Sequence, residues 1–131
     1  MSRTPRIPVS WGELVDKITI LEIKSERLGD VGARANVARE LALLSEAAVL
    51  ELSGNDAARD LKGKLRTVNE ALWEIEDKIR QKEAQSAFDE SFVALARSVY
   101  KRNDERAALK RQINALLSSE LVEEKSYTSY G

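Results

Sequence analysis

The chain has 131 residues, a formal net charge of −1 at pH 7, and neither cysteine nor histidine. The missing residue types exclude disulfides, thiolate metal sites, thiol catalysis and any Ser-His or Cys-His nucleophile pair. The near-neutral charge gives no general field that would attract nucleic acid or an anionic membrane surface.

The composition is typical of long helices. Ala, Glu, Lys, Leu and Arg supply about half of the chain, and both prolines precede Val9, so no later residue forbids a helix. No apolar run is long enough to span a bilayer, and the first residues contain no apolar signal region. We therefore predict one cytoplasmic, all-α domain over residues 1–131, with an N-terminal arm at 1–9 and a C-terminal tail at 119–131.

The first helix is predicted to follow Ser10. This residue and Glu13 have the spacing of a capping box, in which each side chain accepts a backbone N–H of the other. Gly29 offers a stop. One apolar face follows at helical spacing: Leu14, Ile18, Leu21, Ser25 and Leu28.

A second helix is expected over about residues 31–52, because apolar residues recur there with helical spacing. Gly54 fits the position after its end, and either Asn55 or Asp56 fits the N-cap of the next helix. The stripe of this second helix consists of Val37, Leu41, Leu44 and Ala48.

The third helix, roughly residues 57–84, is predicted from an uninterrupted heptad seam. The seam residues are Leu61, Leu65, Val68, Leu72, Ile75 and Ile79. A second, mostly polar stripe flanks the seam and consists of Asn69, Trp73, Glu76, Arg80 and Glu83.

The fourth helix is expected to follow Asp89 as its N-cap, and its apolar seam is interrupted. The seam begins with Phe92, Ala96 and Val99 and ends with Ile113 and Leu117. Between them the same register falls on Asn103, Arg106 and Lys110. The tail that follows has no helical stripe, and its two tyrosines, Tyr127 and Tyr130, leave open whether it is disordered or folds back on the helices or across a dimer interface.

Short connections favour antiparallel neighbours. Two architectures fit: an antiparallel four-helix bundle, or a long helical hairpin with two further packed helices. Pairing the last two helices about a turn near residues 86–87 places Asn103 near Trp73, and Arg106 near Asn69.

Three interpretations of the polar interruption remain open. It can be an internal network, with Arg106 paired to Glu76 or Glu22 and Asn69 to Asn103, because an unpaired buried charge is costly. It can be a solvated segment, if the fourth helix leaves the bundle near Lys101. It can also be a pocket for an anionic ligand.

The local charge favours the pocket. Residues 97–114 contain six cationic and two anionic side chains, and arginine suits planar contacts to carboxylate or phosphate. In this interpretation the cations bind the anion, the amides orient it, and the aromatic rings cover it. The candidate ligand-binding residues are Asn69, Trp73, Glu76, Arg97, Tyr100, Asn103, Arg106 and Lys110. We predict no metal, no cofactor and no catalytic residue.

Several stretches together resemble a family of small bacterial proteins known only as a domain of unknown function. They are IPVSWGELVDKITILEIKSER, LRTVNEALWEIEDKIRQKE, FVALARSVYKRNDERAALKRQIN and SELVEEKSY, and the likeness extends from Ile7 to Tyr127. The resemblance carries no functional residue over. It implies a link to cell-surface polysaccharide or sugar-nucleotide metabolism.

The expected function is therefore a non-catalytic binding or accessory protein that captures an anionic ligand or partner between the last two helices. The alternatives are a small all-α enzyme acting on a phosphorylated metabolite, with a carboxylate such as Glu76 as base, and a structural module that recruits partner helices. We expect a homo-oligomer, with a dimer favoured, and no nucleic-acid partner.

Overall fold

The computed structural model describes residues 3–126 and 129, and within them it contains four helices and no strand. These are α1 (Trp11–Arg27), α2 (Val31–Ser53), α3 (Asp56–Ala84) and α4 (Glu90–Leu116). The all-α prediction is thus confirmed, and the helices begin and end close to the positions expected from the sequence. Tyr127 and Tyr130 lie outside the described residues.

Each helix begins at a polar cap. The side chains of Ser10, Asp30, Asn55 and Asp89 each accept a backbone N–H from three residues further on. Ser10 and Asp89 confirm the prediction, and Asn55, not Asp56, is the cap of α3. Only half of the predicted capping box forms. Ser10 accepts the N–H of Glu13, but the carboxylate of Glu13 accepts a hydrogen bond from Lys110 of α4.

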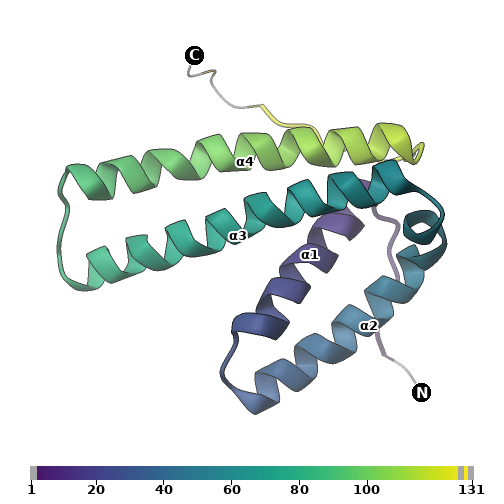
Figure 1. The fold of residues 1–131 in the computed structure, drawn as a ribbon, viewed down its shortest axis with the longest axis horizontal. Helices are drawn as coiled ribbons and strands as arrows, with labels where there is room; N and C mark the ends of the chain where they lie inside the picture. The colour runs from purple at the N-terminus through teal and green to yellow at the C-terminus, as the bar shows by residue number, and fades with distance from the viewer. Residues whose placement is uncertain (1–2, 127–128, 130–131) are drawn as a thin grey trace.

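The helices form two antiparallel hairpins that cross at one end (Figure 1). α3 and α4 make the long hairpin, and α1 and α2 make the short one. α1 contacts all three other helices, whereas α2 packs against α1 and α3. The result combines the two predicted architectures, with a four-helix cluster at one end and a two-helix arm at the other.

The apolar core lies where α1 enters the long hairpin. Val15, Leu65 and Ile113, from α1, α3 and α4, are at most 1% exposed and pack together. α1 is buried on more than the one face expected, since Val15 and Ile23, which lie outside that face, are buried as well. Its central position between three helices explains this difference.

Beyond the core, the apolar seams of α3 and α4 are less buried. In α3 the predicted seam is buried from Leu65 to Leu72, whereas Ile75 and Ile79 are only half-buried. The same holds for Phe92 and Val99 in α4. The heptad pattern is continuous, but α1 and α2 do not reach this part of the hairpin (Figure 1).

A Schellman turn ends α4 and sends the tail back along it. Ser118 has a positive φ of 54°, and the N–H of Ser119 donates to the carbonyl of Asn114 at 2.8 Å. The chain then runs beside α4 (Figure 1). Of the possibilities left open for the tail, its described part folds back on the helices.

Candidate functional site

Asp16 of α1 is the centre of the polar interruption. Its carboxylate is 1% exposed. Arg106 of α4 donates to it twice, from Nε to Oδ1 at 2.9 Å and from Nη2 to Oδ2 at 2.5 Å. Asn69 of α3 donates from Nδ2 to Oδ1 at 2.9 Å. Three helices therefore meet at one buried carboxylate.

Thr19, one turn further along α1, completes this network. Its Oγ1 accepts the second N–H of Asn69 at 2.9 Å and donates to the carbonyl of Asp16 at 2.7 Å. Among the described residues, no buried side-chain nitrogen or oxygen lacks a hydrogen-bond partner. A buried polar cluster that is fully satisfied fixes the packing of the helices around it.

Arg106 is held as a permanent cation. Its hydrogen bonds to Asp16 raise the pKa of the guanidinium, against the lowering effect of burial. The partner differs from the two carboxylates considered from the sequence. Glu22 pairs with Lys62 and Arg66 of α3 instead, and Glu76 is exposed on the arm.

Lys110 lies one turn further along α4 and has two carboxylate partners. Its side chain is 8% exposed, and its Nζ donates to Glu13 of α1 at 2.8 Å and to Glu123 of the tail at 2.6 Å. Burial alone would lower the pKa of Lys110, but the hydrogen bonds to Glu123 and Glu13 outweigh it and raise the pKa. The ammonium group therefore stays charged inside the protein.

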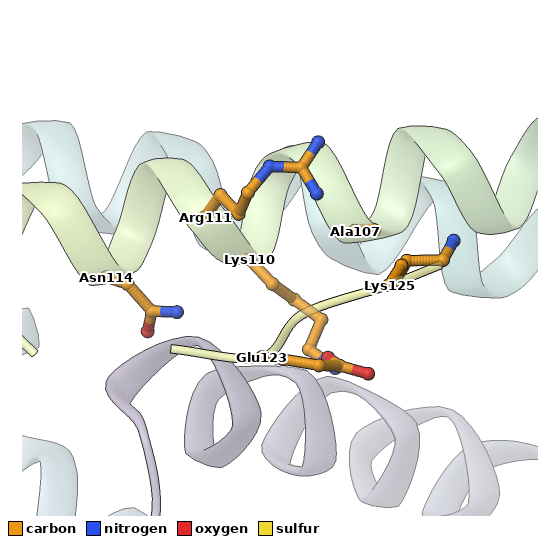
Figure 2. A pocket seen from close by; sticks show the side chains of 6 residues that line it. All are labelled: Ala107, Lys110, Arg111, Asn114, Glu123 and Lys125. Carbon is orange, nitrogen blue, oxygen red and sulfur yellow. The ribbon is translucent and has the colours of Figure 1, made fainter. Parts of the chain in front are cut away.

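A small hollow opens between α4 and the tail at this point. Figure 2 shows Lys110 and Glu123 pointing toward one another across it, while the guanidinium of Arg111 points away. Lys125 lies on the tail beside them and donates to Asp104 at 3.2 Å. The residues that line the hollow are Ala107, Lys110, Arg111, Asn114, Glu123 and Lys125.

The start of α1 is docked on the end of α4. The N–H of Gly12 donates to Oδ1 of Asn114 at 2.7 Å, and the N–H of Trp11 donates to Oγ of Ser119 at 3.2 Å. Helix N-termini expose unsatisfied N–H groups, and here residues from the other end of the chain satisfy two of them. This contact sets the position of α1, and hence of Glu13 and Asp16.

The predicted site residues separate into two groups. Asn69, Arg106 and Lys110 meet α1 in the network described above. Trp73 and Asn103 are half-buried nearby, whereas Glu76, Arg97 and Tyr100 are exposed on the arm. At about 1.5 Å per residue, Arg97 lies about 20 Å from Lys110 along α4, so one small ligand group cannot contact both.

Sequence reasoning missed the carboxylates that meet these cations. The carboxylates of Glu13 and Asp16 come from α1, as does the hydroxyl of Thr19 that binds Asn69, and the carboxylate of Glu123 comes from the tail. A signal for Asp16 and Thr19 was present. They alternate with Val15, Ile18 and Ile20, and a helix that is apolar around most of its circumference buries its polar residues too.

Two other kinds of feature do not occur in the described part of the chain. No group of three or more Asp and Glu side chains there is arranged to hold a metal ion. Of the helices α1 to α4, none combines the length and the apolar character needed to cross a membrane.

Comparison with known protein families matches residues 6–130 to one model, described as a family of unknown function (DUF6165). No curated protein and no solved structure matches the chain.

Proposed function

The chain belongs to this family of unknown function, and we propose that it is a non-catalytic binding protein that takes a carboxylate or phosphate group at Lys110. The incoming anion replaces the carboxylate of Glu123. One observation supports this above the others: a lysine ammonium that is almost fully buried is completed by a carboxylate from a half-exposed tail residue.

The two partners of Lys110 differ in how firmly they are held. Glu13 belongs to α1, whose N-terminus is fixed by hydrogen bonds to Asn114 and Ser119. Glu123 lies after the last helix, and its side chain is 50% exposed. Only Lys110 of this pair is buried, and the carboxylate of Glu123 keeps contact with water, so a ligand anion with better geometry can displace Glu123.

Lys110 itself cannot remain without an anion. A buried ammonium group is costly unless it is paired, which favours any carboxylate or phosphate that reaches it when the tail moves away. The exchange replaces one negative group by another, so the balance of charge in the network is preserved. Lys125 lies on the same tail beside the hollow, where it pairs with Asp104 at 3.2 Å.

The proposed site contains fewer of the predicted residues than the pocket expected from the sequence. Arg106 is occupied on two of its donors by Asp16, so its role is to hold α4 against α1. Lys110 is the binding cation in the proposal, and Asn114 lies beside it in the lining of the hollow. The proposed ligand therefore approaches between α4 and the tail.

The test is a thermal melting screen with inorganic phosphate, citrate and the sugar nucleotide UDP-glucose. A ligand at tenfold its dissociation constant stabilises the protein by about 1.4 kcal/mol, which shifts the melting temperature of a domain of this size by about 4–7 °C. Glu123→Gln removes the competing carboxylate and is expected to bind the same anion several-fold more tightly. Lys110→Met is expected to abolish the shift.

Glu124→Gln is the matched control, because it removes the same charge from the neighbouring tail position. It should bind like the unchanged protein. If no anion shifts the melting curve of either the unchanged protein or Glu123→Gln, the proposed function is wrong. Equal effects of Glu123→Gln and Glu124→Gln would also contradict it, since they would indicate a general charge effect.

A further inference from the structure

The arm is the part of the long hairpin beyond the four-helix cluster, residues 73–102. No residue from 73 to 109 is buried. The last buried residue of α3 before the arm is Leu72, and the next buried residue in the chain is Lys110 of α4. In Figure 1 the arm projects past α1 and α2. α1 reaches its first turn through Arg27, whose Nη2 lies 3.4 Å from Oε1 of Glu74, and further along, the two arm helices cover each other.

Apolar side chains nevertheless continue along the arm. Ile75, Ile79, Phe92 and Val99 are half-buried between the two helices. Phe88 and Val93 are 59% and 52% exposed, and Phe88 makes an edge-to-face contact with Phe92 at 5.3 Å between ring centroids. A unit of two short helices is too small to bury such residues by itself.

The charges on the arm reverse sign halfway along each helix. In α3 the half near the cluster is acidic, and most of the half near the tip is basic. In α4 the tip is acidic and the half near the cluster is basic. The acidic residues are Glu74, Glu76, Asp77 and Glu83 in α3, and Asp89, the N-cap, and Glu90 at the start of α4; the basic residues are Lys78, Arg80 and Lys82 in α3 and Arg97, Lys101 and Arg102 in α4. Lys82 and Asp89 already form an ion pair with each other at 3.0 Å.

A pattern that reverses at its middle is complementary to a second copy of itself turned end to end. We infer that the arm is a homodimerisation surface, on which two arms pack antiparallel about a two-fold axis near Lys78. Each α3 then lies against the α3 of the second copy, with Glu76 of one copy beside Arg80 of the other, and α4 packs against α4. The exposed apolar residues are covered between them.

The antiparallel arrangement also suits the shape of the molecule. It places the four-helix clusters of the two copies at opposite ends of the paired arms (Figure 1). Parallel arms would bring both clusters to the same end, where α1 and α2 of each copy need room. The inference is independent of the anion site, since the arm contributes no residue to the hollow at Lys110.

The dimer is expected to be weak. Each arm helix contributes about 12 residues, or about 18 Å, and is about 10 Å wide, so the paired faces cover only a few hundred Å² on each copy. Interfaces of this size lie below the roughly 1,000 Å² in total that stable complexes exceed, and are typical of weak, transient association. We therefore expect a dissociation constant in the micromolar range.

Sedimentation equilibrium of the full chain between about 5 and 500 µM tests this. The mass is expected to rise from monomer to dimer across that range. Val93→Glu should weaken dimerisation at least tenfold without loss of helical circular dichroism. The matched control is Leu50→Glu on α2, which also changes a highly exposed apolar residue and should leave the association unchanged.

A charge exchange tests the antiparallel register. About an axis at Lys78, Glu76 of one copy faces Arg80 of the other. Glu76→Lys should weaken the dimer, and the double variant Glu76→Lys with Arg80→Glu should restore it. A mass that stays monomeric over the whole range would overturn the inference, and so would a dimer that depends on Leu50 instead of Val93. Failure of the double variant to restore association would overturn the antiparallel register.

Discussion

Asp16 and Arg106 lie 90 residues apart in the sequence and form a bidentate ion pair whose carboxylate is 1% exposed. Asn69 and Thr19 tie the same carboxylate to α3 and to the backbone of α1. The polar run in α4 is therefore neither an exposed segment nor an empty pocket at this level. It is the contact that sets where α1 crosses the long hairpin.

Removing one member of this pair leaves the other charge buried. Asp16→Ala and Arg106→Ala are each expected to lower the free energy of unfolding by about 3–5 kcal/mol. Arg106 keeps some exposure, so its variant should fall at the lower end. Urea denaturation measures both. The double variant Asp16→Leu with Arg106→Leu should cost less than the two alanine changes added together, and full additivity would argue against the ion pair.

Gly12 is required by the close approach of α1 to α4. A Cβ at this position would lie 2.5 Å from the carbonyl oxygen of Lys110, which is backbone and cannot rotate away. We expect Gly12→Ala to destabilise the protein by about 1–3 kcal/mol. Gly63→Ala is the control, because nothing lies within 4 Å of its Cβ, and it should raise stability by up to about 1 kcal/mol. Denaturant midpoints of the two variants should move in opposite directions.

Asn69 contributes two donors, which an acidic side chain cannot supply. Asn69→Asp places a second carboxylate against Asp16, with Arg106 as the nearest cation. The repulsion raises the pKa of the new carboxyl group in the folded state, so its stability penalty appears as the pH rises through that pKa. The loss relative to the unchanged protein should be large at pH 7 and smaller near pH 4. Asn69→Leu should show a loss with little pH dependence, and parallel pH profiles for both variants would contradict this assignment.

Docking of the tail should depend on pH through Glu123. The hydrogen bond from Lys110 lowers the pKa of this carboxyl group. A lowered pKa in the docked state means that the contact is fully present above the ordinary glutamate value of about 4.3, and is lost as the pH falls through the lowered pKa. NMR signals of residues 119–125 should shift together in that acidic range. Glu123→Gln should remove the transition, whereas Glu124→Gln should retain it.

The sequence predicts the helices well because their signals are local. Caps such as Ser10 and Asp89 act over three residues, and heptad spacing is visible within one helix. The extent of burial is not local. Ile75 continues the seam as regularly as Leu65, and only the lengths of α1 and α2 decide that one is half-buried and the other is 0% exposed.

Only the cations of the site could be predicted from the sequence, and not the carboxylates that pair with them. The cations Arg106 and Lys110 are conspicuous because they interrupt an apolar seam, and the prediction that they turn inward is consistent with the structure. Their partners are separated from them by up to 97 residues, and the apolar surroundings of Asp16 in the sequence indicate its burial but not the cation that it meets. Which carboxylate meets which cation depends on the crossing of α1 over α4, which no spacing within either helix encodes.

The docking of Trp11 and Gly12 on Ser119 and Asn114 has a consequence for the order of folding. Of the four helices, α1 is translated first, and it depends on acceptors that are translated about a hundred residues later. Until then it lacks both its terminal hydrogen bonds and the cation that neutralises Asp16. The α3–α4 hairpin has to form before α1 can pack against it. A chain truncated before Arg106 is therefore expected to expose an unpacked α1 to chaperones and proteases.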